Sequence, residues 1–590
     1  MPPGYHGFYL RIDAGTGTAT RVPLPEEVVR QYLGGSGLGA RLLLDQGSAV
    51  SDPLAPEAPI VFAFSPLVGS PLTTSAKFAV VSKSPLTNRI NDSLASSGFA
   101  LAGKRCGCDA IVIVGRAPEL SVLVIDDGDV RLEAADDVRG ESCPATEEKL
   151  RARLGSDYRI ASIGPAGERA VRYATISHDG RHAGRGGSGA VLGSKRIKAI
   201  AVRGKQYCEF ADPKRVTELS RDLSKRSFGP ATAKYRELGT ATNLLTFNRF
   251  GTLPTRNFQS GTFEEAINLS PQELAAQREK TRASCVACTI GCEHIYAVGR
   301  TPQSGAGDPH SSPAGVRVEY ESLFALGSLC GVGDSDAVLR ASQRCDELGI
   351  DTISTGGTIA FAMECVERGL LDESWLRFGD GAAMLRAIEL IGRREGIGAL
   401  LGEGSRRAAE QIGRGSLAFA PQVKGLEIPG YEPRALQTMA LGFAVGARGA
   451  DHNRSGAYEV DFSDKVDRRN ATLESVRHAI ETEDRAALMD SLILCKFLRG
   501  VFTDIYAESS AMLRAVTGWD VTADELRATA RRIVAAKHQF NVLAGWTLDE
   551  DTLPDRFLDR ALPNDPAALL TRESLDALIA EYHRQRAELS

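Results

Sequence analysis

The chain has 590 residues and a mass of 63.1 kDa, a length for about four domains of ordinary size or fewer larger ones. Hydrophobic residues make up 43% and charged residues 25%, which is typical of globular proteins. With 75 acidic and 70 basic residues the net charge is −5, which excludes a dominant basic surface for nucleic acid or anionic membranes. No uncharged apolar run approaches the roughly 18 residues of a membrane span, and the start of the chain lacks a secretory signal, so we expect a cytoplasmic protein.

Residues 1–208 are predicted to form a β-rich domain. Short apolar runs bounded by Gly, Pro, Asp or Ser predict its strands, with a few helices between them. The expected strands are 58–64, 78–82, 110–114 and 121–125, and the expected helices are 25–33 and 145–154. A glycine-rich turn at 184–189 precedes a further apolar segment.

From Asp212 onward the apolar spacing is mostly helical, as in 216–223, 335–348 and 382–394. The Gly- and Pro-rich segment that starts at Pro429 predicts a second boundary. We therefore expect an α+β protein with an N-terminal β-rich domain (1–208) and two mainly α-helical domains (209–424 and 425–590). Residues 299–315 are predicted to form a mobile surface loop.

Three of the eleven cysteines lie within eight residues, in the pattern Cys285-x2-Cys288-x3-Cys292. Eleven is an odd number and too few for a disulfide scaffold, so this group indicates metal. Three thiolates at this spacing suit one face of a [4Fe–4S] cluster, which then needs a fourth ligand from elsewhere, and Cys495 is a candidate. Zinc stays an alternative, because four thiolates also form a tetrahedral structural site. A lone Cys in an apolar segment such as that of Cys495 is more often a core residue.

Short segments with a recognisable order and spacing run along nearly the whole chain. They are Gln31-Tyr-Leu-Gly-Gly-Ser-Gly-Leu-Gly, Lys83-Ser-Pro-Leu-Thr, Ala161-Ser-Ile-Gly-Pro-Ala-Gly-Glu, His178-Asp-Gly, Gly184-Arg-Gly-Gly-Ser-Gly, Glu319-Tyr-Glu-Ser, Cys345-Asp-Glu-Leu-Gly-Ile-Asp, Thr517-Gly-Trp-Asp and Asp551-Thr-Leu-Pro-Asp-Arg-Phe. In this order the chain resembles the aldehyde ferredoxin oxidoreductase family, tungsten or molybdenum bis-pterin (molybdopterin) enzymes with one [4Fe–4S] cluster. The resemblance implies the same three domains, with the cofactor at their interface.

The family holds its two pterins with two copies of a D-x-x-G-L-(D/C) motif. This chain offers Asp346-Glu-Leu-Gly-Ile-Asp351 and Asp490-Ser-Leu-Ile-Leu-Cys495. A carboxylate can accept two adjacent N–H donors of the pterin edge together, and a buried carboxylate needs such partners. The resemblance thus implies pterin contacts from Asp346, Ile350, Asp351, Asp490 and Leu494. It also makes Cys495 the fourth cluster ligand, which weakens the zinc interpretation.

Backbone N–H groups in glycine-rich turns bind phosphate well, although such a turn alone is weak evidence. The resemblance implies contacts to the pterin phosphates, or to a bridging Mg²⁺, from Arg181, His182 and Gly184. Further cofactor contacts are implied for Lys77, Leu94, Ser96, Arg448 and Arg454.

The family's proton-handling pair corresponds to Glu321 and His452, with Tyr320 expected in the same pocket. Oxidation of an aldehyde hydrate releases two protons, and a carboxylate with a raised pKa accepts one of them. A histidine can hydrogen-bond the substrate oxygen. Without the family, a solvated helix acid and a structural histidine are the simpler interpretations.

Several residues depart from the family pattern. Lys77 stands where arginine is common, which keeps the charge but loses the bidentate fork. The segment 93–98, aligned with the first pterin loop, lacks the usual Asn and Gly pair. Ile493 replaces a glycine, so that turn must bury a branched side chain. Arg340 and Gln343 replace the E-x-x-H pair of a subunit-bridging iron, so any homodimer is expected to lack that metal.

The leading hypothesis is an oxidoreductase that converts aldehydes to carboxylic acids, or the reverse, and passes electrons through the cluster to ferredoxin or a multi-cluster subunit. A first alternative keeps the cofactors and reduces activated aromatic rings. A second is a zinc-stapled, non-catalytic subunit of a larger complex.

Overall fold

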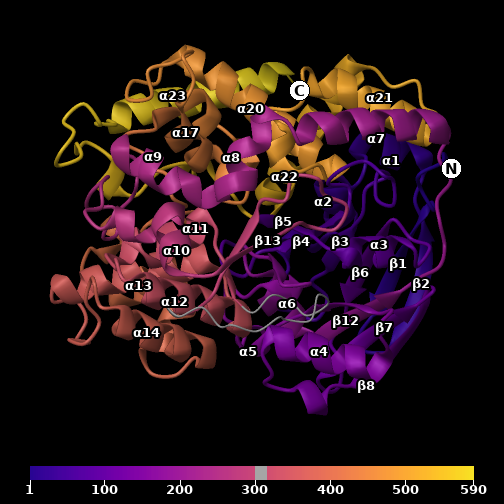
Figure 1. Cartoon of the computed structure of the whole chain (residues 1–590), viewed down its shortest axis with the longest axis horizontal. Coiled ribbons are helices and arrows are strands. Elements are labelled where there is room, and N and C mark those ends of the chain that lie inside the picture. Colours follow the sequence, from indigo (N-terminus) through magenta and orange to yellow (C-terminus); the bar gives the residue numbers. More distant parts are fainter. Residues whose placement is uncertain (299–314, 590) are drawn as a thin grey trace.

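The computed structural model covers the whole chain and describes residues 1–298 and 315–589. The predicted surface loop 299–315 lies almost entirely outside the described residues. Strands dominate up to Arg203 and helices from Pro213 onward, as expected (Figure 1). The exact domain limits stay a prediction. In the described part of the chain, no helix is long and apolar enough to cross a membrane.

Two six-stranded sheets form the N-terminal region. The first has the order β2 (Thr18–Pro23), β1 (Phe8–Asp13), β6 (Ala110–Val114), β3 (Ile60–Ala63), β4 (Lys77–Lys83), β5 (Ile90–Ser96). The second has the order β11 (Arg181–Ala183), β10 (Ile176–His178), β9 (Arg159–Ser162), β12 (Ile197–Arg203), β7 (Ser121–Asp126), β8 (Asp129–Ala134). The four predicted strands correspond to β3, β4, β6 and β7, and the predicted helices to α1 (Glu26–Tyr32) and α4 (Cys143–Leu154).

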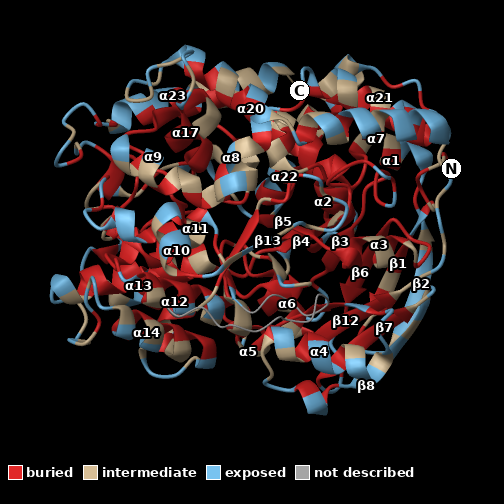
Figure 2. Ribbon diagram, viewed as in Figure 1, coloured by how far each residue is buried: buried red, intermediate tan, exposed pale blue. Residues whose placement is uncertain are grey.

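The two sheets pack face to face because their central strands are apolar on both sides. In β6, Ile111 and Ile113 point into the core between the sheets, whereas Ala110 and Val112 point to the opposite face. That opposite face is covered by α2 (Gly35–Asp45), α20 (Leu473–Leu492), α21 (Ile505–Thr517) and α22 (Ala523–Leu543) (Figure 1). The helix α4 covers the outer face of the second sheet. Figure 2 shows the resulting buried interior.

The helix α7 (Pro213–Ser227) packs against α21 on the helical side of the first sheet. Most of the other helices build or border a second large core beside the sheets. They are α8 (Pro230–Leu238), α9 (Asn243–Arg249), α10 (Pro271–Gln277), α11 (Tyr320–Leu326), α12 (Ser335–Leu348), α13 (Thr352–Glu367), α14 (Gly381–Arg393), α15 (Ile397–Leu401), α16 (Ser405–Ile412), α17 (Gln437–Val445), α18 (His452–Ser455), α19 (Tyr458–Asp461) and α23 (Arg572–Leu589). A small sheet of β13 (Lys280–Ala283), β14 (Glu293–Tyr296) and β15 (Val316–Arg317), which the sequence analysis did not anticipate, lies among them.

The glycine-rich start of α2 explains the first of the quoted segments. Gly35 has φ +42°, and a Cβ there would collide with the carbonyl oxygen of Asp490. The N–H of Gly37 donates to the Ser491 hydroxyl at 3.1 Å. These glycines let α2 pack directly on the end of α20, which positions the second aspartate motif.

Candidate active site

A cavity of about 960 Å³ lies where the sheets meet the two helical regions. Its wall includes residues of β4, β5 and β11, of α8, α9 and α11–α13, and of the segments 448–454 and 490–500. Every predicted site residue lines this cavity except Cys288, which lies between its two lining neighbours Cys285 and Cys292. Residues spread from Lys77 to Cys495 are thus brought together around one space.

The cysteine loop connects β13 to β14 and lies close to Cys495. Burial, followed by the nearby charge of Cys495, raises the pKa of the Cys292 thiol to about 12. Thr74 ties the two cysteine segments together. Its N–H donates to the carbonyl of Ala287 at 2.5 Å, and its hydroxyl accepts from the N–H of Cys495 at 3.2 Å. The loop and the C-terminal segment are therefore fixed relative to each other by a residue of the N-terminal region.

Two cations lie beside these thiols. A hydrogen bond with Cys288, and then the charges of Arg181 and Lys77, lower the pKa of Cys285 to about 5. Burial opposes the charge of Lys77, yet the Cys495 and Cys285 thiolates hold the pKa of this lysine above its ordinary value. Positive charge next to the thiols favours the thiolate form that binds metal. Among the described residues, no three His, Cys, Asp or Glu side chains lie close enough to share one ion.

The strand β5 corrects one expectation. Leu94 and Ser96 were expected on a pterin loop, but both belong to β5, where Leu94 pairs with Ala79 and Ser96 with Lys77. The antiparallel pairing continues to the end of β5 because no glycine interrupts the segment. It sets Ser96 and Lys77 side by side on the cavity wall.

The two motif aspartates have different surroundings. Asp490 is 1% exposed, with Arg454 Nη1 at 3.1 Å and Lys496 Nζ at 2.8 Å from its carboxylate oxygens. Asp346 has His182 Nε2 at 3.4 Å, and burial raises the pKa of its carboxyl group to about 7. Burial also lowers the pKa of His182 to about 4, so this histidine is neutral at physiological pH.

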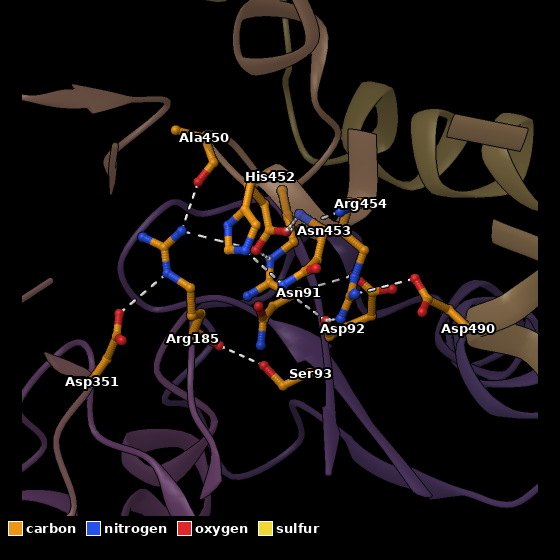
Figure 3. A network of polar contacts seen from close by, with 12 residues as sticks. Asn91, Asp92, Ser93, Arg185, Asp351, Ala450, His452, Asn453, Arg454 and Asp490 are labelled. Atoms are coloured by element: carbon orange, nitrogen blue, oxygen red, sulfur yellow. Dashed lines mark hydrogen bonds and ion pairs between the residues drawn. The ribbon is translucent and has the colours of Figure 1, made fainter. Parts of the chain in front are cut away.

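A buried ionic network connects the second aspartate to the N-terminal sheet (Figure 3). Asp92 on β5 accepts contacts from Arg454 Nε at 3.1 Å and Lys537 Nζ at 2.7 Å, and its carbonyl accepts from Arg448. Although burial opposes ionisation, Arg454 and Lys537 hold the pKa of Asp92 far below its usual range. Arg454 thus lies between the carboxylates of Asp92 and Asp490.

Arg185, in the glycine-rich turn, links three parts of the chain. Its guanidinium lies 3.3 Å from Asp351 and donates to the carbonyl of Ala450 at 2.7 Å (Figure 3). It also donates to the carbonyl of Glu427 at 2.5 Å. Other buried cationic atoms on the cavity wall have no hydrogen-bond partner among the described residues, namely Arg181 Nε and Arg448 Nη2. Unpaired buried donors of this kind are costly unless a ligand accepts from them.

Glu321 and His452 face each other in the cavity. His452 Nε2 lies 3.7 Å from Glu321 Oε1, and the N–H of Gly430 donates to Oε2 at 3.0 Å. Burial raises the pKa of Glu321 to about 8, although Gly430 and Arg185 partly oppose it. Burial lowers the pKa of His452 to about 3, so the imidazole is neutral. The pair is a proton acceptor next to a neutral hydrogen-bonding ring.

Tyr320, next to Glu321 in the sequence, has a buried and hydrogen-bonded side chain. Its side chain is 2% exposed, and its hydroxyl donates to the carbonyl of Gly430. Gly430 therefore contacts Glu321 through its N–H and Tyr320 through its oxygen. This engagement makes Tyr320 a wall residue that fixes Gly430, rather than a free acid.

Aromatic rings form the outer part of the cavity, which we call the aromatic arm (Phe247, Phe250, Tyr431, Tyr458 and Phe462). Tyr431 stacks on the His452 ring at 5.1 Å, and Phe247 is parallel to Phe462 at 5.1 Å. Phe250 and Phe462 are partly exposed at the rim, with 46% and 37% exposure. The arm connects solvent with the Glu321–His452 pair through an apolar wall.

Four residues of the site were missed from sequence: Thr74, Asp92, Arg185 and Lys537. Arg185 belongs to the quoted glycine-rich turn, so its position next to Gly184 was the available signal. Asp92 and Lys537 lie far apart along the chain and carry no local pattern. Only the fold brings them together.

A buried cavity lined by cations, with thiols at one side and a paired acid and histidine at the other, is typical of a redox enzyme. The sequence profiles of the aldehyde ferredoxin oxidoreductase family match residues 9–204 (N-terminal domain) and 217–587 (domains 2 and 3). The chain belongs to this family.

Two relatives and one solved structure are similar over almost their full lengths. The tungsten-containing aldehyde ferredoxin oxidoreductase of Pyrococcus furiosus is 37% identical over 580 residues, with 95% of this chain and 93% of that protein covered. The WOR-like subunit of an aliphatic sulfonate oxidoreductase from the same organism is 28% identical, with 98% and 94% covered. The active-site complex BamBC of benzoyl coenzyme A reductase matches with a TM-score of 0.81 at 22% identity, with both chains covered completely. This last likeness concerns the fold.

Proposed function

We propose that this protein oxidises aldehydes to carboxylic acids, or catalyses the reverse, at a tungsten (or molybdenum) bis-pterin centre in the cavity, and passes the electrons through a [4Fe–4S] cluster. The observation that carries the proposal is the Glu321–His452 pair, which faces a cavity whose wall also holds buried guanidinium nitrogens without a hydrogen-bond partner among the described residues. The tungsten-containing relative at 37% identity supports the same reaction.

The residues present fit these cofactors. Cys285, Cys288, Cys292 and Cys495 would hold the cluster, with Lys77 and Arg181 next to it. The unpaired donors of Arg181 and Arg448 suit phosphate oxygens, which accept charge-assisted hydrogen bonds. Pterin contacts would come from Leu94, Ser96, Asp346, Ile350, Asp351, Arg454, Asp490 and Leu494, and His182 and Gly184 would lie by a phosphate-bound Mg²⁺.

When bound, the bis-pterin centre supplies the two-electron oxidation of the hydrated aldehyde. Glu321, with a pKa of about 8, accepts a proton from the hydrate in its carboxylate form. His452 stays neutral and hydrogen-bonds a substrate oxygen, because its pKa of about 3 excludes an imidazolium at working pH. The aromatic arm supports a substrate with an apolar or aromatic group next to its aldehyde.

The two electrons leave one at a time, because a single [4Fe–4S] cluster carries one electron. The acceptor is a ferredoxin or a multi-cluster subunit. If the chain dimerises, Arg340 and Gln343 on α12 support an interface without a bridging iron, since neither is a carboxylate or an imidazole.

Metal analysis of anaerobically purified protein tests the cofactors. The expected result is roughly four irons and one tungsten or molybdenum per chain, with an absorption at about 400 nm that decreases when aldehyde is added. Zinc without iron would contradict the proposal. Reduction of an activated aromatic ring in place of aldehyde oxidation would favour the alternative reaction on the same cofactors.

Glu321→Gln tests the proton acceptor. We expect kcat for aldehyde oxidation with a dye acceptor to fall by about 10²–10⁴. Since the base acts deprotonated, the wild-type rate should rise with pH through a midpoint near 8, and this limb should vanish in the variant. His452→Gln, which keeps a hydrogen-bonding group, is the matched control and should retain the limb. A Glu321→Gln enzyme with full metal content and unchanged kcat would exclude this role.

A further inference from the structure

Positive charge gathers on one surface of this acidic protein. The surface consists of α7, α8 and the cysteine hairpin, residues 213–238 and 280–292, and we call it the cluster-side surface. It contains nine Lys and Arg but only three acidic residues, whereas the whole chain has a net charge of −5. The helix α7 runs along the exterior of the molecule, and Figure 2 shows many exposed residues along it.

Contacts between these segments make the surface continuous. The hydroxyl groups of Ser227, at the end of α7, and Thr289, in the cysteine loop, lie 2.6 Å apart. Lys280 Nζ donates to the carbonyl of Glu237 at 3.1 Å, which joins β13 to α8. Gly239 comes directly after α8 and lies next to the cysteine loop. A Cβ at this position would be 3.4 Å from the backbone oxygen of Cys292. The two helices and the loop are therefore joined by direct contacts.

The surface has exposed apolar groups among its cations. Phe228 is 55% exposed, and the Arg236 guanidinium lies over its ring at 4.2 Å. Val286, inside the cysteine loop, is 39% exposed. Lys225 and Arg282 are exposed and form no ion pair with any residue the structure describes. Apolar anchors within a charged rim are characteristic of protein–protein interfaces, and charged rims accelerate association with partners of opposite sign.

The location of the surface relates it to the cysteines. Val286 and Ala287, between Cys285 and Cys288, are both exposed, so the cysteine loop itself reaches the protein surface. Tyr235 on α8 is also close to the thiols, since after burial the charges of Cys495 and Cys292 contribute to raising its pKa. A partner seated here would lie directly against the cysteine loop, next to a group bound by these thiols.

We propose that the cluster-side surface docks a small acidic iron–sulfur protein that takes electrons from the chain. The inference rests on the proposed function, which supplies the electrons. In each encounter the reduced cluster of this chain gives one electron to an oxidised cluster of the partner, so two partners are reduced for each aldehyde oxidised. Charge complementarity selects an acidic partner, and Phe228 and Val286 supply the apolar contact.

The test compares two electron acceptors in the holoenzyme with Lys225→Glu and Arg282→Glu combined. One acceptor is an acidic bacterial-type ferredoxin, and the other is benzyl viologen, a small dye that needs no docking surface. We expect kcat/KM for ferredoxin to fall at least about tenfold at low salt, and its salt dependence to weaken, because rim charges govern the association rate. The dye rate and the iron content should stay unchanged.

A matched control carries the same charge change at Arg169 and Arg377, two exposed residues outside the surface, and should reduce ferredoxin like wild type. Phe228→Ala should raise KM for ferredoxin without altering the dye rate. Unchanged ferredoxin kinetics in the charge-reversed enzyme would overturn the proposal, as would a wild type that reduces the dye but not ferredoxin. A change from dimer to monomer in light scattering would show instead that a second copy of this chain occupies the surface. Failure of aldehyde to reduce the dye in wild type would refute the proposed function.

Discussion

The two aspartate motifs, 346–351 and 490–495, have the same backbone path but different charged neighbours. Each begins in the last turn of a helix and passes through a left-handed residue at its end, Gly349 (φ +71°) after α12 and Ile493 (φ +65°) after α20. Each ends on a residue that starts the next helical segment, Asp351 before α13 and Cys495 before a short 3₁₀ helix. A shared local geometry thus presents the first aspartate of each motif to the same cavity.

The difference between the copies lies in what surrounds them. Asp490 lies between Arg454 and Lys496, whereas the ion-pair partner of Asp346 among the described residues is a neutral histidine at 3.4 Å, and burial raises the pKa of Asp346 to about 7. The second motif also continues into a cysteine. The comparison teaches that helix-end geometry determines where a group is presented, and long-range contacts determine its charge and chemistry.

The last residue of each motif should give the largest contrast. Cys495→Ser removes a thiolate, so we expect the cluster iron and the dye-linked activity to be lost almost completely. Asp351→Asn in the first copy keeps the helix cap and should retain the iron. Iron analysis and the absorption at about 400 nm measure the cluster content of both variants. Full iron in Cys495→Ser would mean that the fourth ligand lies elsewhere.

Asp490→Asn should destabilise the protein strongly. It removes the carboxylate that pairs with Lys496 and one of the two that pair with Arg454, at a site that is 1% exposed. Breaking a buried ion pair from one side costs about 3–5 kcal/mol, to be read from the shift of the urea unfolding midpoint. Asp346→Asn is the counterpart, with no cation pair to break. Equal losses for the two variants would contradict the electrostatic difference.

Gly349→Ala tests the shared turn in the first motif. A Cβ at Gly349 would lie 2.8 Å from Gly164 N and 3.0 Å from Cys143 Sγ, in a left-handed conformation that costs a non-glycine residue about 1–2 kcal/mol. With the steric overlap, we expect a loss of about 2–4 kcal/mol in the free energy of unfolding. Gly369→Ala, also at positive φ but with no atom near its Cβ, isolates the backbone part. If both variants lose the same free energy of unfolding, the close approach of Gly349 to Gly164 does not contribute to the loss.

The pH dependence of stability should separate the two aspartates as well. Because the pKa of Asp346 is raised from 3.8 to about 7, the folded protein keeps a proton that the unfolded chain releases. The contribution of this group to stability therefore falls as pH rises from about 4 to 7 and stays low above that. Its side chain is 38% exposed, so water screens part of the effect. The unfolding midpoint of Asp346→Asn should not show that decline between about pH 4 and 7. If the variant and the wild type have the same pH profile, Asp346 does not cause the decline.

Sequence reasoning succeeded where local pattern decides the structure. The short apolar run 110–114 became β6, and the helical spacing of 335–348 became α12 with the same limits. It failed where a contact closes over a long stretch of chain. Lys537 reaches Asp92 across 445 positions, and Thr74 reaches Cys495 across 421. The segment 93–96 was expected as a loop because it aligns with the family's first pterin loop, but pairing with β4 makes it a strand.

Ile493→Leu should have the smallest effect and tests the other left-handed turn. Ile493 is fully buried, and its side chain packs against Gly35, so the space that Gly349 lacks is available here. A β-branched residue at φ +65° is strained, and leucine relieves the branching at almost equal volume. Relief and repacking oppose each other, so the free energy of unfolding should change by less than about 1 kcal/mol. Ile493→Ala, which removes the packing atoms, is the control and should cost about 2–5 kcal/mol. A loss in Ile493→Leu as large as that would mean that the branched shape itself holds α20 on α2.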